Sequence, residues 1–145
     1  MMALPVTFIR AFSDTFLTDD IDEFMQLIDQ DCGWVIMATG ETFRGAGEGR
    51  QLAERSVAAR KHTKDVHMDF TNLFSTEDQM CLEYAHRAIV TEQWPSASNR
   101  PPAGTKVDIK ICLVCHVKDG KFDRIHEYFD LGQVVSLGAV RRLYS

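Results

Sequence analysis

The sequence has no unbroken apolar run long enough to span a bilayer, so a membrane-embedded protein is not expected. Residues 1–5 lack the basic region and the long apolar stretch of a secretory signal peptide. Lysine and arginine are scattered along a chain of net charge −5, so no basic face is available to neutralise nucleic-acid phosphates. These absences predict a cytoplasmic protein that binds neither membranes nor nucleic acid.

Metal-binding patterns are also absent, because there is no His-Glu-x-x-His motif and no two histidines have the helical spacing of metal ligands. Cys112 and Cys115 do have the CxxC spacing of redox and zinc sites. They lie in an apolar, β-branched run without Gly or Pro, where residues three apart face opposite sides of a strand. We therefore interpret the four cysteines as small buried residues of a reducing compartment, and we expect no metal and no cofactor.

The chain has 145 residues, 45% of them hydrophobic, and no internal repeat, so we expect one domain over residues 1–145. Helical patterns come first along the chain. Phe8, Phe12 and Phe16 recur at every fourth position, which indicates the buried face of a helix. An aspartate at position 19 or 20 is placed to cap a second helix, which is expected to end at residues 31–33. A third helix is expected to follow the glycines at positions 45, 47 and 49 and to end near residue 61.

Strand patterns follow the helices. Residues 34–39 predict a short strand, and residues 42–44 are placed to pair back onto it. Asp119-Gly120 is a favoured two-residue hairpin turn between the last two of four long strands. Helices that precede such a meander predict an α+β fold, here a cone-shaped, strongly curved antiparallel sheet closed by three N-terminal helices. The four long strands are expected over residues 65–75, 79–93, 106–118 and 121–131.

Alternation with period two assigns the two faces of the sheet. The hairpin register places Glu127 on the apolar face of the strand over residues 106–118, so one carboxylate interrupts an apolar row. In the strand over residues 79–93 we assign the odd-numbered residues, including Arg87, to the same face. The even-numbered residues, including Tyr84 and His86, are also rather apolar and are assigned to the opposite face. Apolar residues on both sides predict a concave face with a pocket and a convex face that forms a homodimer.

Glu127 is the strongest single candidate for a functional residue. A carboxylate on an apolar wall is costly unless it is paired or protonated. One interpretation is a general acid or base with a shifted pKa. The others are a structural ion pair with Arg87 and a carboxylate that reaches solvent. Trp34 is interpreted either as a pocket wall with an indole donor or as plain core packing.

Two segments match a known family. Residues 40–45, Gly-Glu-Thr-Phe-Arg-Gly, lead into a helix, and residues 124–131 read Arg-Ile-His-Glu-Tyr-Phe-Asp-Leu. With the order of elements, they resemble the SnoaL-like group of the nuclear-transport-factor-2-like superfamily over nearly the whole chain. That group includes polyketide cyclases, ketosteroid isomerase, limonene-epoxide hydrolase, dehydratases and binding modules. The resemblance therefore implies the fold and leaves the activity open.

The resemblance extends to single positions of two of these enzymes. The tyrosine and the two aspartates of ketosteroid isomerase fall near Phe12, Val114 and Ile36, which are all apolar, so its mechanism is not implied here.

Limonene-epoxide hydrolase resembles the chain more closely. It has a carboxylate immediately before Tyr-Phe-Asp, which Glu127 matches, and an arginine that Arg87 matches. Its aspartate two residues after that arginine falls at Ile89, and its water-holding tyrosine and asparagine fall at Trp34 and Ile36. The resemblance therefore leaves proton transfer by Glu127 open and puts activation of water in doubt.

We expect a cofactor-independent cyclase, isomerase or hydro-lyase that transfers a proton on a small apolar, carbonyl-bearing substrate. Glu127 is expected to be the base or acid, and Arg87 to stabilise developing negative charge. The alternative is a non-catalytic module that binds or carries a small apolar ligand. The residues expected to line the pocket are Trp34, Ile36, Ile89, Ile109, Ile111, Leu113, Phe129 and Phe12.

Overall fold

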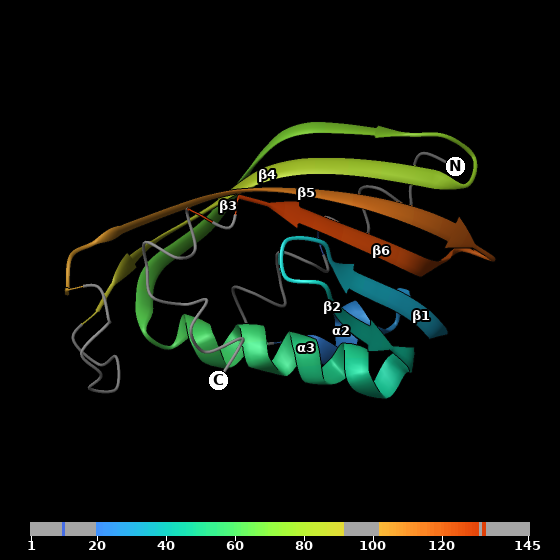
Figure 1. The fold of residues 1–145 in the computed structure, drawn as a ribbon, viewed down its shortest axis with the longest axis horizontal. Coiled ribbons are helices and arrows are strands. Elements are labelled where there is room, and N and C mark those ends of the chain that lie inside the picture. The colour runs from blue at the N-terminus through green and yellow to red at the C-terminus, as the bar shows by residue number, and fades with distance from the viewer. Residues whose placement is uncertain (1–9, 11–19, 92–101, 131, 133–145) are drawn as a thin grey trace.

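The computed structural model describes residues 10, 20–91, 102–130 and 132. Two helices and six strands lie wholly within these residues (Figure 1). The helices are α2 (Ile21–Met25) and α3 (Gly45–Arg60). The strands are β1 (Ile28–Ile36), β2 (Glu41–Arg44), β3 (Thr63–Ser75), β4 (Gln79–Val90), β5 (Lys106–Lys118) and β6 (Lys121–Phe129). The predicted first helix, with its phenylalanine stripe, lies outside the described residues.

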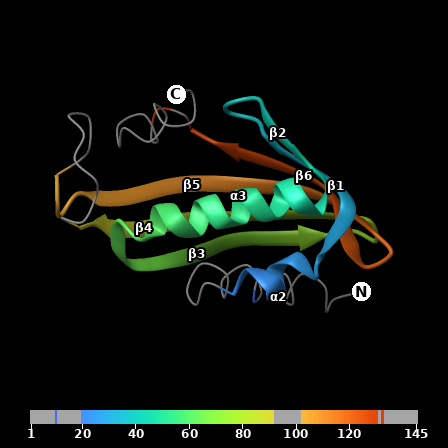
Figure 2. The same cartoon turned by 90° about the horizontal axis from the view of Figure 1, so that it is seen from below.

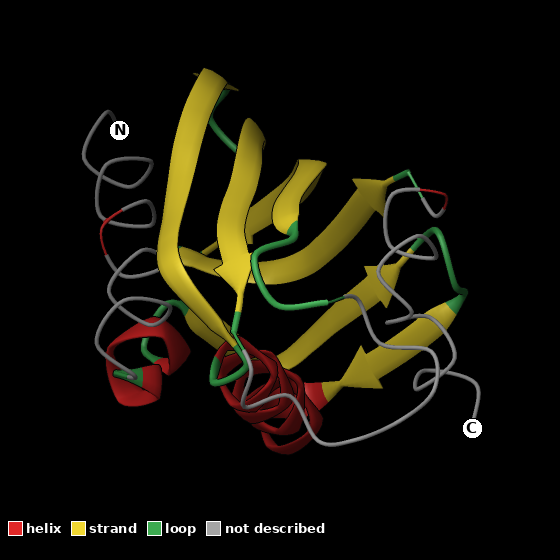
Figure 3. Cartoon of the chain, turned by 90° about the vertical axis from the view of Figure 1, so that its left-hand side faces the viewer, coloured by secondary structure: helices red, strands yellow, loops and turns green. Residues whose placement is uncertain are grey.

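The six strands form one sheet in the order β2-β1-β6-β5-β4-β3. All neighbours are antiparallel except β1 and β6, which are parallel. Asp119 and Gly120 join β5 to β6 with positive φ angles of 52° and 76°, as a tight hairpin turn requires. The sheet curves strongly, but its edge strands β2 and β3 do not pair with each other (Figure 3). The α+β class and the curved sheet are confirmed, whereas the sheet stays open and two described helices, not three, accompany it.

The second helix is much shorter than the sequence pattern predicts. It begins as expected, because the Asp20 side chain accepts a hydrogen bond of 3.2 Å from the Glu23 backbone N–H. It ends at Met25, and β1 begins at Ile28. The prediction that this helix continues to residues 31–33 is wrong because burial alternates along residues 32–36, so these residues bury their apolar side chains as a strand.

The core fills the space between the sheet and the two helices. We call the sheet face that α3 covers the concave face, and the opposite face the convex face (Figure 2). Phe24 of α2 and Leu52 of α3 belong to the same buried cluster as Leu82, Leu113 and Ile125 of the sheet. The helices therefore rest on the concave face and bury its apolar side chains. No described helix is long and apolar enough to cross a membrane.

The two long central strands test the assignment of faces. In β5 the predicted dry set is confirmed, since Val107, Leu113 and Cys115 are buried. In β4 the predicted set is wrong. Leu82 pairs with Leu113, which pairs with Glu127, so the even-numbered residues of β4 share the concave face. Arg87 lies on the convex face, where its charge reaches solvent, and Ile89 lies there with it.

Candidate functional site

Glu127 lies on the concave wall of β6, between Leu113 of β5 and Ile36 of β1. Trp34 of β1 donates a hydrogen bond of 3.2 Å from its indole Nε1 to the Glu127 Oε1 atom. The Phe24 ring packs against the indole, with ring centroids 5.7 Å apart, and holds it in place. The sequence pattern assigned Glu127 to the apolar face and left Trp34 as either a pocket wall or core packing; the structure joins the two residues by this hydrogen bond.

Burial decides the ionisation of this carboxyl. Burial raises the pKa of Glu127 from 4.5 to about 7, while the Trp34 hydrogen bond and the charge of Arg55 act in the opposite direction. A carboxyl with a pKa near neutral pH is present in both its ionised and its protonated form. It is therefore suited to accept a proton from a bound molecule or to return one.

Arg55 is the cation whose charge acts on Glu127, and the sequence analysis did not identify it. It lies on α3, where its Nη1 atom contacts the Glu41 Oε2 atom at 3.2 Å. Its guanidinium lies over the Phe43 ring, 5.2 Å from the centroid. Arg55 follows Leu52 by three residues, so helical spacing places both toward the same side of α3. That spacing is a signal by which the residue could have been found.

Tyr84 extends the polar part of the concave wall. Its pKa lies well above the ordinary value, first because of burial and then because of the charges of Glu127 and Cys115. The phenol therefore keeps its proton and can donate a hydrogen bond. The neighbouring even-numbered residue of β4, His86, has a pKa lowered by burial and then by His67, so its imidazole is neutral at neutral pH. The sequence analysis placed both residues on the convex face, and that assignment is wrong.

Arg87 is not brought to Glu127. Its Nη1 atom contacts the Asp69 Oδ2 atom at 2.5 Å, and its Nε atom lies 3.5 Å from the Asp108 Oδ1 atom. Both acids are on the convex side of the neighbouring strands. The expected ion pair between Glu127 and Arg87 is therefore not formed. Successive residues of a strand face opposite sides, and the even-numbered residues of β4 share the face of Glu127, so Arg87 points away from it.

The remaining predicted lining residues divide into three groups. Five are on the concave face, where Leu113 and Ile36 are buried and the other three pack at the edges of the core clusters. Ile89 is on the convex face, and Phe12 lies outside the described residues. Their role in binding a ligand stays a prediction. The five concave residues are Ile36, Ile109, Ile111, Leu113 and Phe129.

Solved structures of similar fold come from several sources. A protein of ketosteroid isomerase-like fold from Catenulispora acidiphila, in complex with trimethylamine, has a TM-score of 0.67 and 15% identity, covering 90% of both chains. An NTF2-like protein of unknown function from Burkholderia pseudomallei has a TM-score of 0.69 and 15% identity, covering 92% of this chain and 96% of that one. TerC, co-crystallised with polyporic acid, has a TM-score of 0.67 and 16% identity, covering 92% and 97%.

These identities are low, so the structural likeness establishes the fold alone. No curated protein matches the sequence. The family of SnoaL-like domains, however, matches residues 9–125 directly. The match spans most of the chain, including α2, α3 and nearly all of the sheet. The chain therefore belongs to the SnoaL-like domain family and has the nuclear-transport-factor-2-like fold.

Proposed function

We propose that this protein is an enzyme of the cyclase, isomerase or hydro-lyase kind, which moves a proton on a small, mostly apolar, carbonyl-bearing substrate. The observation that carries the proposal is the state of Glu127, a carboxyl on an apolar wall with a pKa of about 7. A carboxylate that stays ionised in a core is normally paired with a cation, because an unpaired buried charge is costly. Among the described residues, Glu127 instead has one hydrogen-bond donor, the neutral Trp34 indole, and its pKa is close to that of a working acid or base.

Each polar group near Glu127 has a role in this proposal. Ionised Glu127 removes a proton from a carbon next to the substrate carbonyl, and the protonated acid returns it to another atom. The Tyr84 phenol, which keeps its proton, donates toward the oxygen where negative charge develops. Arg55 supplies the positive charge that the sequence analysis assigned to Arg87. Ile111 and Phe129 provide apolar surface for the substrate.

The relatives support a pocket for small organic molecules and do not choose among activities. TerC was crystallised with polyporic acid, and the Catenulispora protein with trimethylamine. One fold supports catalysts and binding proteins alike, so the activity depends on the side chains of the site.

A second candidate is a non-catalytic module that binds or carries a small apolar ligand. Arg55 favours it, because its guanidinium is already bound by Glu41 and stacked on Phe43. A cation held in this way contributes to the structure of the wall and offers less charge to a reaction. In this reading a protonated Glu127 serves only as a hydrogen-bond donor to the ligand.

Hydrogen exchange separates the two candidates without knowledge of the product. The protein is incubated in D₂O with a set of cyclic and aromatic ketones, and deuterium at carbons next to the carbonyl is measured by NMR. The enzyme proposal predicts exchange that Glu127→Gln abolishes and that Glu83→Gln, an exposed carboxyl on the convex side of β4, retains.

Ligand binding is followed in the same samples through Trp34 fluorescence in a Trp94→Phe background. Binding without exchange supports the carrier. Exchange that survives Glu127→Gln contradicts the assignment of Glu127 as the acid or base.

A further inference from the structure

One polar side chain of the concave wall, His86 of β4, is not used by the proposed function. His86 shares the concave face with Tyr84 and Ala88, because the even-numbered residues of β4 face the concave side. Tyr84 and Ala88 are each 5% exposed, whereas His86 between them is only half-buried. The imidazole therefore keeps accessible surface on the same face of the sheet as Glu127.

His86 lies where two apolar clusters of the concave face meet. Its neighbour on β3 is Met68, which packs against the larger of the two clusters. Its neighbour on β5 is Ile109, which packs against the smaller one. A ligand at this position therefore meets a single polar group set between apolar side chains, an arrangement that fixes the orientation of a small molecule.

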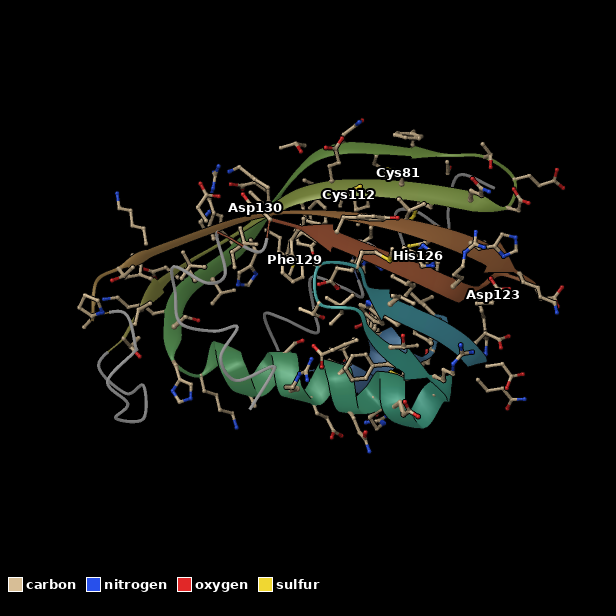
Figure 4. All side chains as sticks on the ribbon, viewed as in Figure 1. Cys81, Cys112, Asp123, His126, Phe129 and Asp130 are labelled. Carbon is tan, nitrogen blue, oxygen red and sulfur yellow. The ribbon has the colours of Figure 1, made fainter. Side chains whose placement is uncertain are left out.

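A strip of half-buried side chains connects Glu127 to His86 along the concave wall. It runs from Glu127 and Phe129 on β6 (Figure 4) through Ile111 and Ile109 on β5 to His86. On β5 the strip ends at buried residues on both sides, Leu113 at 0% and Val107 at 8% exposure. The strip therefore offers a ligand an apolar surface with a polar side chain at each end.

The register of the strands separates the two ends of this strip. Glu127, Leu113 and Leu82 lie in one row across β6, β5 and β4, and His86 is four residues further along β4. At about 4.8 Å between strands and about 3.3 Å per residue, the Cα atoms of Glu127 and His86 are roughly 16 Å apart along the sheet. Side chains converge on the concave side of a curved sheet, so the carboxyl and the imidazole are closer than their Cα atoms. A ligand that contacts both needs two polar groups joined by an apolar spacer.

We propose that His86 positions the ligand by a hydrogen bond to a hydroxyl group at the end remote from Glu127. This inference rests on the proposed function for the placement of the carbonyl end of the ligand at Glu127. The ligand class that follows is a ketone with a hydroxyl group across an apolar, ring-sized spacer.

The chemistry of the imidazole selects the hydroxyl. An imidazole has two ring nitrogens, so it can keep a partner in the protein with one and bind a ligand with the other. A hydroxyl both donates and accepts, so it pairs with either nitrogen. Burial, and then the charge of His67, lower the pKa of His86, so the ring is neutral at neutral pH. A neutral ring favours a hydroxyl over a carboxylate, which an imidazolium would attract.

The test uses pairs of ketones that differ by one hydroxyl group. The first pair is β-tetralone and its analogue with a hydroxyl on the far side of the aromatic ring, and binding is measured by isothermal titration calorimetry, which needs no turnover. Wild type should bind the hydroxylated ketone about tenfold more tightly, the effect of one hydrogen bond. This preference does not depend on how any variant folds.

Three variants assign the preference to a residue. His86→Phe keeps a ring and removes both nitrogens, so it should bind the two ketones equally. His86→Gln restores a side chain that donates and accepts, so it should retain part of the preference. His126→Phe is the matched control, since His126 is also half-buried but lies on the convex face of β6, and it should keep the preference of the wild type.

Hydrogen exchange in the same samples separates this inference from the proposed function. A preference that His86→Phe loses supports the role of His86 even if no ketone exchanges, and in that case the enzyme proposal fails alone. Exchange that depends on Glu127, together with equal binding of both ketones by the wild type, would overturn the role of His86 alone. Equal weakening of both ketones by His86→Phe, as a merely structural residue would show, or absence of binding of the hydroxylated ketone, would also overturn it.

Discussion

The indole Nε1 atom of Trp34 lies 3.2 Å from the Glu127 Oε1 atom, and this contact depends on the parallel pairing of β1 with β6. In that register Trp34 lies opposite Ile125, and Ile36 lies opposite Glu127. The donor is therefore in place on a rigid part of the sheet before any ligand arrives. It stabilises the ionised carboxylate and keeps the Glu127 pKa from rising further under the influence of burial.

Stability should fall as the pH rises through the range in which Glu127 titrates. The folded protein keeps the Glu127 proton up to about pH 7, whereas the unfolded chain releases it near the ordinary pKa of 4.5. The folded state therefore binds more protons between these values, and its advantage is lost as the pH rises. The contribution is at most on the order of 3 kcal/mol.

Thermal melts of wild type and Glu127→Gln at about pH 5 and about pH 8 measure this contribution. The glutamine keeps an acceptor for Trp34 and carries no charge, so its melting temperature should depend less on pH. A variant with the same pH dependence as the wild type would show that Glu127 titrates as it does in solvent.

Replacement of Trp34 by Phe removes the indole donor and keeps an aromatic ring. Since the hydrogen bond lowers the Glu127 pKa, its loss should raise that pKa above the wild-type value. We also expect a loss of stability of about 1–3 kcal/mol, because the partly buried carboxyl loses its hydrogen-bond donor. The pH dependence of the melting temperature measures both effects, and a midpoint that stays or falls would contradict the role given to Trp34.

Arg55→Met should also raise the Glu127 pKa, because it removes the positive charge that favours the carboxylate. Arg50→Met is the matched control, since Arg50 is on the same helix and pairs with Asp22 instead. Arg87→Met should likewise leave Glu127 unchanged, because Arg87 binds Asp69 on the convex face. If Arg87→Met shifts the titration and Arg55→Met does not, the assignment of faces in β4 is wrong.

Self-association through the convex face remains our prediction for the oligomeric state. Phe74, Val114 and Tyr128 expose 58%, 36% and 43% of their surface there, and an exposed apolar patch is typical of a protein–protein contact surface. Light scattering should give about twice the chain mass of 16.4 kDa. Val114→Lys should shift the mass to that of one chain, whereas Gln51→Lys on the exposed side of α3 should not. A wild type that stays monomeric would contradict this prediction.

The faces of a strand could be predicted from the sequence where successive residues differ clearly in polarity. In the first half of β5, residues 106–111, charged and apolar residues alternate, and both the bounds of the strand and its buried face were predicted correctly. In β6 the alternation of Ile125, Glu127 and Phe129 indicated the face of Glu127 correctly. The turn at Asp119-Gly120 alone would place Glu127 opposite Cys112, and a one-residue register shift at His116 and Val117, which the sequence pattern did not reveal, brings it opposite Leu113. In β4 the odd-numbered and the even-numbered residues both include apolar side chains, so polarity alone did not decide the face. The charges of Glu83 and Arg87 indicate that the odd-numbered residues face solvent, as the structure shows.

The rest of the site depends on contacts between segments that are distant in the sequence. Arg55 acts on Glu127 only because α3 lies across the concave face, and Trp34 reaches it only because β1 pairs with β6. The early start of β1 likewise depends on tertiary burial of Ile28 and Cys32. These features are set by packing between distant segments, and alternation within one segment does not report on them.

The central claim is that Glu127 is a partly buried carboxyl that titrates near neutral pH. It is tested most directly by ¹³C NMR of the glutamate carboxyl carbons as a function of pH, with the Glu127 signal assigned by its loss in Glu127→Gln. The account predicts a midpoint of about 7, together with a smaller change at the Trp34 indole N–H in the same range. A Glu127 midpoint at the ordinary value of 4.5 would contradict it.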